Sequence, residues 1–234
     1  MNLIAWYEAY WAAKDDSVDH ERLDLMLPHI QPGQRLFQLD GGPGMLAARI
    51  VQERGATVVM TDLSAGAVAR ARTRGLDASQ LYIAEANIPH PDASFDVVLS
   101  DSAIEHHFDP ARSFDELARV LKPGGAFILC LPNIAHWRCR LWLLRGRFPI
   151  VPATPTDFTH LRFFTLTEIR AWLHARGLAI THVDGSASLW VRQGFYPAWL
   201  RHPWLRPWYT RLARRWPTLF ARDLIIIARK QAAS

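Results

Sequence analysis

The sequence predicts an α/β fold in which helices cover both faces of a doubly wound, mostly parallel sheet whose last strand is antiparallel. Short apolar runs alternate with helical stretches at the spacing of βαβ units. The length of 234 residues suits one such domain. Near the carboxyl end, one apolar run follows another without a long amphipathic helix between them, which favours an antiparallel pair at the edge of the sheet.

Six apolar runs are predicted to be short buried strands. They are Arg35–Leu39, Thr57–Thr61, Leu81–Ala84, Asp96–Ser100, Ala126–Leu131 and Leu178–Val183. Helices are predicted at 45–54, 64–74, 110–121 and 165–176. The run Asp223–Arg229 is the expected antiparallel strand.

The chain divides into four regions by composition. We expect an N-terminal helical cap over 1–30, a core over 31–184, an insertion over 185–222, and the final strand and tail over 223–234. The insertion contains five Trp, four Pro and seven Arg but no acidic residue. Because a parallel strand ends at the ligand-binding edge of an open sheet, the insertion is expected to begin there. The basic, aromatic stretch 132–160 is expected at the same edge.

Composition excludes several classes of protein. No run of about eighteen apolar residues occurs, so a membrane-spanning helix is not expected. The first sixteen residues lack the pattern of a secretory signal, which favours the cytoplasm. Cys130 and Cys139 are too few for a disulfide framework or a cysteine zinc site. The ten histidines show no tight spacing, so no metal site is predicted.

Charge is distributed unevenly along the chain. Residues 1–116 carry nine basic and eighteen acidic side chains, whereas 117–234 carry eighteen basic and four acidic ones. An imbalance of this size predicts one strongly positive surface on the folded domain.

A glycine-rich turn follows the first predicted strand. In the stretch Asp40-Gly41-Gly42-Pro43-Gly44, the glycines allow close approach of a ligand to the backbone, and the following helix offers free N–H groups. Asp62 ends the second strand, eighteen residues after Gly44. Its carboxylate can accept both hydroxyls of a ribose; the alternative is that it only caps the helix at Ser64. Together the two features indicate a site for an adenosine-type nucleoside.

Four further motifs occur in a fixed order: Ala93–Ser100, Ile104-Glu105-His106, Arg119–Gly125 and Leu131-Pro132-Asn133. With this set the chain resembles class I S-adenosylmethionine (SAM)-dependent methyltransferases over about residues 19–183. The segment Pro132–Pro149 is most similar to the MetW-like, methyltransferase type 11 group. The resemblance implies a Rossmann-like class I methyltransferase fold and SAM as cofactor.

The resemblance also implies a cofactor site. Asp62 would hold the ribose, and Leu63 would pack on the adenine. Glu85 and Ala86 would reach the adenine edge, Glu85 in place of the more usual Asp. The turn containing Gly41, Gly42 and Gly44 would face the methionine part, and Ser100 and Asp101 would border the sulfonium.

Two residues depart from the family pattern. Asp40 stands where the family usually has Gly, and Gln38 stands where it has an acid. Asp40 would either crowd the carboxylate of the methyl donor or turn toward its ammonium and replace the charge missing at Gln38. These departures keep a second function open, a non-catalytic SAM-binding or interaction protein that regulates a partner enzyme.

Histidines are the candidate catalytic residues. Glu105, His106 and His107 follow the fourth strand, where an acceptor is expected, and His160 and Asn133 belong to the same edge. His106 and His160 could serve as general bases, although a His at the position of His106 often anchors the loop. Methyl transfer itself depends mainly on positioning.

The insertion admits four interpretations. It could be a lid whose Arg side chains pair with an anionic acceptor. It could rest on an anionic membrane, on the inner face, near a lipid-linked acceptor. It could bind nucleic acid, which we regard as the weakest of the three. Finally, it could be a structural cap with buried Trp side chains. The segment 136–148 is predicted to be an amphipathic helix that buries Trp137, Leu141 and Leu144. The expected acceptor is a small or lipid-linked molecule.

Overall fold

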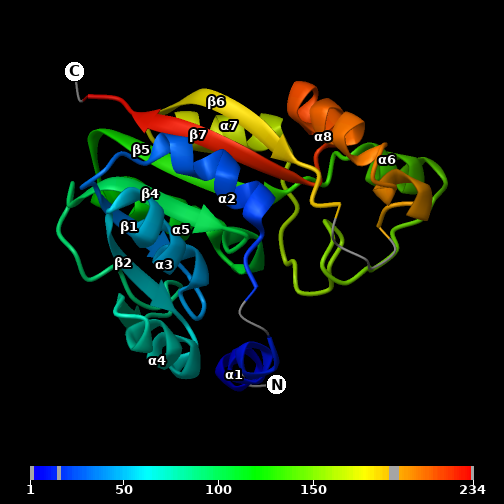
Figure 1. Ribbon diagram of the computed structural model, residues 1–234. Coiled ribbons are helices and arrows are strands. Elements are labelled where there is room, and N and C mark those ends of the chain that lie inside the picture. Colours follow the sequence, from blue (N-terminus) through cyan, green and yellow to red (C-terminus); the bar gives the residue numbers. More distant parts are fainter. Residues whose placement is uncertain (1–2, 15–16, 190–194, 233–234) are drawn as a thin grey trace.

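The computed structural model describes residues 3–14, 17–189 and 195–232. Its centre is a seven-stranded sheet in the order β3-β2-β1-β4-β5-β7-β6, with helices on both faces (Figure 1). The strands are β1 (Arg35–Leu39), β2 (Thr57–Asp62), β3 (Asp77–Gln80), β4 (Phe95–Asp101), β5 (Leu121–Pro132), β6 (Leu178–Ser186) and β7 (Asp223–Lys230). Strands β1 to β5 pair in parallel, and β7 lies antiparallel between β5 and β6. The predicted fold class is confirmed.

The four helices predicted in the core are present with ends that agree to within two residues. The helices are α1 (Leu3–Ala13), α2 (His20–Met26), α3 (Met45–Arg54), α4 (Ala65–Thr73), α5 (Pro110–Val120), α6 (Trp137–Leu144), α7 (Leu166–His174), α8 (Arg206–Arg215) and α9 (Pro217–Phe220), with short 3₁₀ turns η1 (Leu27–His29), η2 (Ile104–His106) and η3 (Ala198–Arg201). Local capping explains two of the starts. The Ser64 side chain accepts the Ala67 N–H at 3.0 Å, and Thr165 forms a capping box with Glu168.

Alternating side chains of the sheet build two apolar layers. On one face, Leu36, Val97 and Ile225 pack with α2, α3 and α4. On the other face, Phe37, Val98 and Ile226 pack with α5, α7 and α8. Since successive strand residues point to opposite faces, near-continuous apolar strands need helices on both sides, as observed.

The third strand does not lie where the sequence predicted it. It is the polar segment Asp77–Gln80, whereas Leu81–Ala84 is a loop. Asp62 pairs with Gln80, and the Leu81 N–H donates to the Asp62 carbonyl at 3.0 Å, after which the chain leaves the sheet. Leu81 and Ile83 are nevertheless buried. Their apolar character therefore reflects burial in the core rather than strand formation.

The prediction for 136–148 is correct about a helix and about Trp137, which packs against the core, but wrong about Leu141 and Leu144. In α6 the buried residue is Cys139, and Trp142 packs against the core three residues later. Leu141 is 38% exposed and Leu144 is 84% exposed. A helix buries residues at spacings of three and four. The core contact falls on the face of Cys139 and Trp142, which turns Leu141 and Leu144 toward the solvent.

The insertion connects two paired strands. β6 continues to Ser186, three residues beyond its predicted end, so the insertion begins after that residue. Trp190, one of its five tryptophans, lies outside the described residues. In α8, Tyr209 and Ala213 are buried against the sheet. Of the helices that the structure describes, none combines the length and the apolar character that crossing a bilayer requires.

Candidate active site

A cavity of about 720 Å³ opens where β1, β2 and β4 end. Ligands of open α/β sheets bind at this edge. Three parts of the wall follow those strands: the glycine turn, the Asp62–Leu63 step and the segment around η2. The remaining wall comes from α1, the first residues of α2, the segments 81–84 and 153–161, and the Arg222–Asp223 step. Figure 1 shows α1 beside this end of the sheet, next to α4.

Asp62 lies inside the cavity and is held by two backbone groups. Its Oδ2 accepts the Gly42 N–H at 2.8 Å, and its Oδ1 accepts the Ser64 N–H at 2.8 Å. Burial raises the pKa of Asp62 to about 7, with a further contribution from the charge of Asp40. Each carboxylate oxygen has a second lone pair, so the capping bond to Ser64 and ribose binding are compatible.

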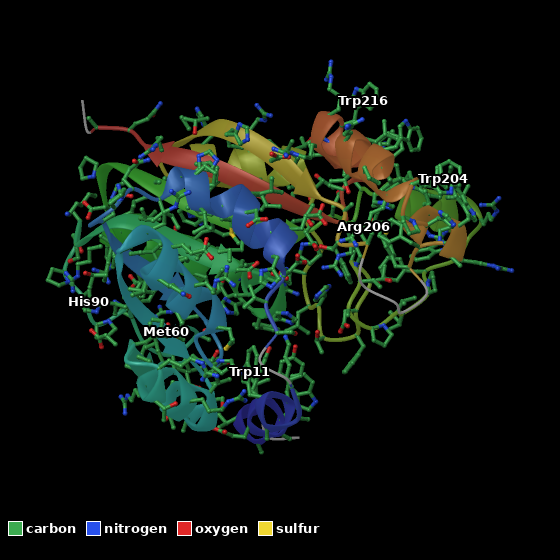
Figure 2. The ribbon with its side chains drawn as sticks, in the orientation of Figure 1. Trp11, Met60, His90, Trp204, Arg206 and Trp216 are labelled. Carbon is green, nitrogen blue, oxygen red and sulfur yellow. The ribbon has the colours of Figure 1, made fainter. Side chains whose placement is uncertain are left out.

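The glycine turn has little free space. Gly42 adopts a positive φ of 58°, and a Cβ there would lie 2.4 Å from the indole of Trp11. Figure 2 shows Trp11 between α1 and the body of the domain. Gly41 lines the cavity, whereas Gly44 faces Leu76 and Ala71. Of the three predicted glycines, Gly41 forms part of the cavity wall. The absence of a side chain at Gly42 leaves room for Trp11 of α1, and its absence at Gly44 lets the turn pack against α4.

Asp40 adopts a φ of 48°, a left-handed conformation that favours glycine. This backbone angle explains why a glycine is usual at the position. The Asp40 carboxylate contacts His107, with Oδ2 2.6 Å from Nε2, and His107 Nδ1 lies 2.6 Å from the Ser113 hydroxyl. Asp40, which stands where the family usually has glycine, therefore points toward His107 and also lines the cavity.

The adenine side of the predicted site is partly different from the expectation. Leu63 lines the cavity, as expected for a residue that packs on a base. The adjoining wall is the loop Leu81–Ala84. Glu85 and Ala86 are exposed and lie outside this wall, because the chain turns at Tyr82, whose carbonyl accepts both of their N–H groups.

The side chains of Ser100 and Asp101 point in different directions at the end of β4. Asp101 lines the cavity, while Ser100 is completely buried and does not line it. Alternation along the strand causes this difference. Asp101 lies 3.5 Å from the guanidinium of Arg22, which also donates to Ser102 at 2.7 Å. Arg22 lies about eighty positions earlier in the chain, so no local pattern could have assigned it to the site.

Helix α1 contributes cavity residues that the sequence did not indicate. Tyr7 points among the acidic groups, and burial, followed by the charge of Asp40, raises its pKa. Glu8 fastens the helix to α4, since its carboxylate accepts from the Ser64 hydroxyl at 2.8 Å and from the Gly66 N–H at 3.1 Å. The predicted cap thus forms one wall of the cavity.

The two candidate catalytic histidines meet at the other end of the cavity. The ring centroids of His106 and His160 are 5.0 Å apart, and Glu105 lies beside them. His106 Nδ1 bonds the Thr159 carbonyl at 3.0 Å, and His160 Nδ1 bonds the Pro155 carbonyl at 3.3 Å. Burial lowers the pKa of His106 to about 4, with His160 adding to the effect, and burial also lowers the pKa of His160. Both imidazoles are therefore neutral at pH 7.

Asn133 has no place in the cavity. Its amide donates to the carbonyls of Pro217, Thr218 and Ala221, and its Oδ1 accepts the Ala135 N–H at 3.0 Å. The amide nitrogen joins the end of β5 to α9 and the residue after it, while the oxygen holds the local turn at Ala135. Its role in this structure is to anchor the insertion.

Apart from Arg222 at its end, the described residues of the insertion do not form the lid that the sequence suggested. Among the described residues, the cavity wall contains Arg222 and Asp223 but none from 195–221. Trp199, Trp204, Trp208 and Trp216 are 59%, 70%, 53% and 50% exposed, which also excludes a cap with these side chains buried. Figure 2 shows Trp204 and Trp216 on the outer side of the α8 region. Helix α1, rather than the insertion, covers the cavity.

A buried acid at the end of the second strand, a glycine turn and a seven-stranded sheet with an antiparallel last strand are together typical of a class I methyltransferase. Comparison with known proteins agrees. Residues 39–129 match the family described as "Methyltransferase domain". The chain is 30% identical over 193 residues to the "Probable S-adenosylmethionine-dependent methyltransferase" of Mycolicibacterium smegmatis, covering 80% of this chain and 68% of that protein. The chain belongs to the SAM-dependent methyltransferases.

Other relatives extend the comparison. The demethylmenaquinone methyltransferase of Clavibacter sepedonicus is 38% identical over 172 residues, covering 72% of this chain and 64% of its own length. Among solved structures, a Haloferax volcanii methyltransferase in complex with the Trm112 activator superposes with a TM-score of 0.68 at 20% identity, covering 97% of this chain and 98% of its own. This second likeness concerns the fold.

The cavity fits the cofactor of this family. Gln38 Oε1 is buried and makes no hydrogen bond among the described residues, and Asp101 Oδ1 makes only the 3.5 Å ion pair with Arg22; both side chains line the cavity. Two such acceptors suit the ammonium of a methionine group. Asp62, at the other side of the glycine turn, has the lone pairs that a ribose would require.

Proposed function

We propose that this enzyme methylates a hydroxyl group of a small, aromatic acceptor that carries a lipid chain. One observation carries the proposal: the same cavity joins a nucleoside end, at Asp62, to a polar end, at Glu105, His106 and His160, through aromatic walls. The walls include Trp6, which stacks on Tyr10 with centroids 5.4 Å apart. Flat aromatic walls suit a planar acceptor.

The cofactor, when bound, supplies an electrophilic methyl group on a sulfonium. An acceptor hydroxyl would take this methyl group and pass its proton to a basic group of the chain, leaving S-adenosylhomocysteine as the second product. Orientation in the cavity provides much of the rate. We assign activation of the hydroxyl to the cluster of Glu105, His106 and His160, since its neutral imidazoles offer free lone pairs.

The names of two relatives support this class of acceptor. The Clavibacter sepedonicus relative is a demethylmenaquinone methyltransferase, and a Xylella fastidiosa relative, 25% identical over 187 residues, is a ubiquinone biosynthesis O-methyltransferase. Both names refer to quinone compounds. Family membership also favours the enzymatic function over the non-catalytic, partner-regulating alternative. The Trm112 complex of the Haloferax volcanii neighbour leaves a partner protein as an additional proposal.

The test is incubation of the purified chain with methyl-labelled SAM and fractionated bacterial extract. We expect label in the organic phase, in a compound whose mass increases by one methyl group, and no such label with Asp62→Ala. Label confined to proteins, nucleic acid or water-soluble compounds would contradict the proposal.

The surface around α6 and α8 fits the delivery of such an acceptor from a membrane. Exposed apolar side chains gather here, including Leu143, Leu144, Trp204 and Trp208. The adjacent Arg140, Arg145, Arg206, Arg211 and Arg215 are exposed, and neither 136–150 nor 185–222 contains an acidic residue. Trp at headgroup depth with Arg on phosphates is typical of a protein that rests on an anionic membrane. We infer that this surface, which is formed by α6, α8 and the residues next to them (Figure 1), contacts the inner membrane face.

A further inference from the structure

We propose that Glu105, His106 and His160 bind a divalent transition-metal ion at the acceptor end of the cavity. The sequence predicted no metal site, because the histidines show no tight spacing and His160 lies more than fifty positions after Glu105 and His106. In the folded chain, one ligand atom from each lies within 4.8 Å of the other two. The proposal rests on the proposed function for the role of the ion, but binding of the metal is tested without any substrate.

The backbone holds the three residues together. Glu105 and His106 belong to η2, whose Glu105 carbonyl accepts the N–H groups of Leu161 at 2.9 Å and Arg162 at 3.0 Å. The Thr159 carbonyl accepts from His106 Nδ1. The segment that carries His160 is therefore tied to η2 on both sides of the histidine. A site built on such fixed segments is organised before a ligand arrives.

Hydrogen bonding fixes the tautomer of both histidines. A carbonyl oxygen can only accept, so Nδ1 of His106 and Nδ1 of His160 each carry the proton. In the neutral ring, Nε2 then keeps its lone pair. A bond from the second ring nitrogen to a carbonyl is the usual support of a metal-binding histidine. Both rings thus have the form that a cation requires.

Glu105 supplies the independent observation. Its side chain is 1% exposed, and neither carboxylate oxygen has a hydrogen-bond partner among the described residues. No ion pair to Glu105 occurs in that part of the chain either. An ionised carboxylate in such a place is strongly unfavourable without a cation or donor. Two arrangements relieve it: a bound cation or a proton on the carboxyl group.

The donor set selects the class of ion. Two imidazoles and one carboxylate suit iron, manganese, cobalt or zinc, whereas magnesium and calcium prefer oxygen ligands alone. All three residues line the cavity, so the remaining coordination positions face the acceptor. Ligand atoms around such an ion are about 3 Å apart, so binding draws the three side chains closer together. An acceptor hydroxyl on the ion would lose its proton more easily.

The first experiment uses the full chain after treatment with a chelator. Titration with Zn²⁺ alone by calorimetry, and with Mn²⁺ alone by electron paramagnetic resonance, should show one ion per chain. Glu105→Gln and His160→Ala should each weaken the affinity at least tenfold. His174→Ala is the matched control, since His174 is an exposed histidine at the end of α7, and its affinity should equal that of the parent chain.

Glu105→Gln also distinguishes a bound cation from a proton on the Glu105 carboxyl group. Glutamine imitates a protonated glutamic acid, so it should preserve folding and SAM binding, measured by thermal denaturation and calorimetry. If the parent chain binds no stoichiometric Zn²⁺ or Mn²⁺, or if both variants bind as tightly as the parent, the metal site is wrong. In that case His160 would contact the hydroxyl directly, and the labelling test of the proposed function would still stand.

Discussion

Asp62 is a buried carboxyl group whose charge controls its use as a ribose acceptor. Burial, then Asp40, raises its pKa to about 7. The folded chain therefore holds this proton more tightly than the unfolded chain, and the group's contribution to stability is lost as pH rises toward 7. Nucleoside binding has the opposite dependence, since the ionised form accepts both ribose hydroxyls.

We predict that nucleoside affinity rises about tenfold between pH 6 and pH 8, the change in the ionised fraction for a pKa near 7. The probe is 5′-methylthioadenosine, which keeps the nucleoside but lacks the amino-acid part of SAM. Calorimetry at several pH values between 6 and 8 measures the dissociation constant of this probe. Asp62→Asn should bind weakly and without pH dependence, and Asp62→Ala should abolish SAM binding. A flat profile for the parent chain would contradict the assignment of Asp62.

Asp40 combines an unfavourable backbone conformation with a useful contact. We predict that Asp40→Gly keeps or strengthens SAM binding, because glycine adopts the φ of 48° at no steric cost. Asp40→Ala is the matched variant: it also removes the contact to His107 but retains the strained angle. Denaturant unfolding should place the glycine variant about 1 kcal/mol above the alanine variant in stability. Equal stabilities would show that the angle is not strained.

At the scale of elements, α8 presents one face to the sheet and the other to solvent. Tyr209 and Ala213 are buried, while Trp208 and Arg211 are exposed. We predict that the chain co-sediments with vesicles containing anionic phosphatidylglycerol at low salt and that the bound fraction falls several-fold in 0.5 M salt. Replacing Trp204 and Trp208 together by Ala should reduce binding to a similar extent.

Val51→Ala is a suitable control for this surface, because Val51 is an exposed apolar residue on α3. It should leave vesicle binding unchanged. Equal binding of the parent chain to neutral and anionic vesicles would contradict the electrostatic part of the proposal. If the chain bound neither kind of vesicle, the proposed contact with the membrane would be wrong.

For the whole molecule, a ligand that binds the native cavity stabilises the fold. We predict that SAM at one hundred times its dissociation constant adds about 2.7 kcal/mol to the free energy of unfolding. For a domain of this size, the melting temperature should rise by about 5 to 10 °C. Differential scanning fluorimetry measures the shift. Asp62→Ala should melt at the same temperature with and without SAM; a shift equal to the parent's would place the ligand elsewhere.

The sequence alone determined the sheet and its antiparallel last strand, and it proposed the nucleoside end of the site. These depend on local patterns: apolar periodicity, a glycine turn that follows a strand, and an acid at the end of the next strand. The same reasoning failed at Leu81–Ala84, because burial of a loop and burial of a strand produce the same apolar run. It also assigned Glu85 and Ala86 to a wall that Leu81–Ala84 forms.

Only the tertiary structure decided what faces the cavity. It left Trp199, Trp204, Trp208 and Trp216 exposed. It also placed Trp11 of α1 on Gly42, directed Asp40 to His107, and brought His160 to Glu105 and His106. Each of these contacts links positions far apart in the chain, and each depends on the direction of a side chain. Local periodicity carries neither kind of information, because it fixes which face of an element is apolar but not which distant residue meets it.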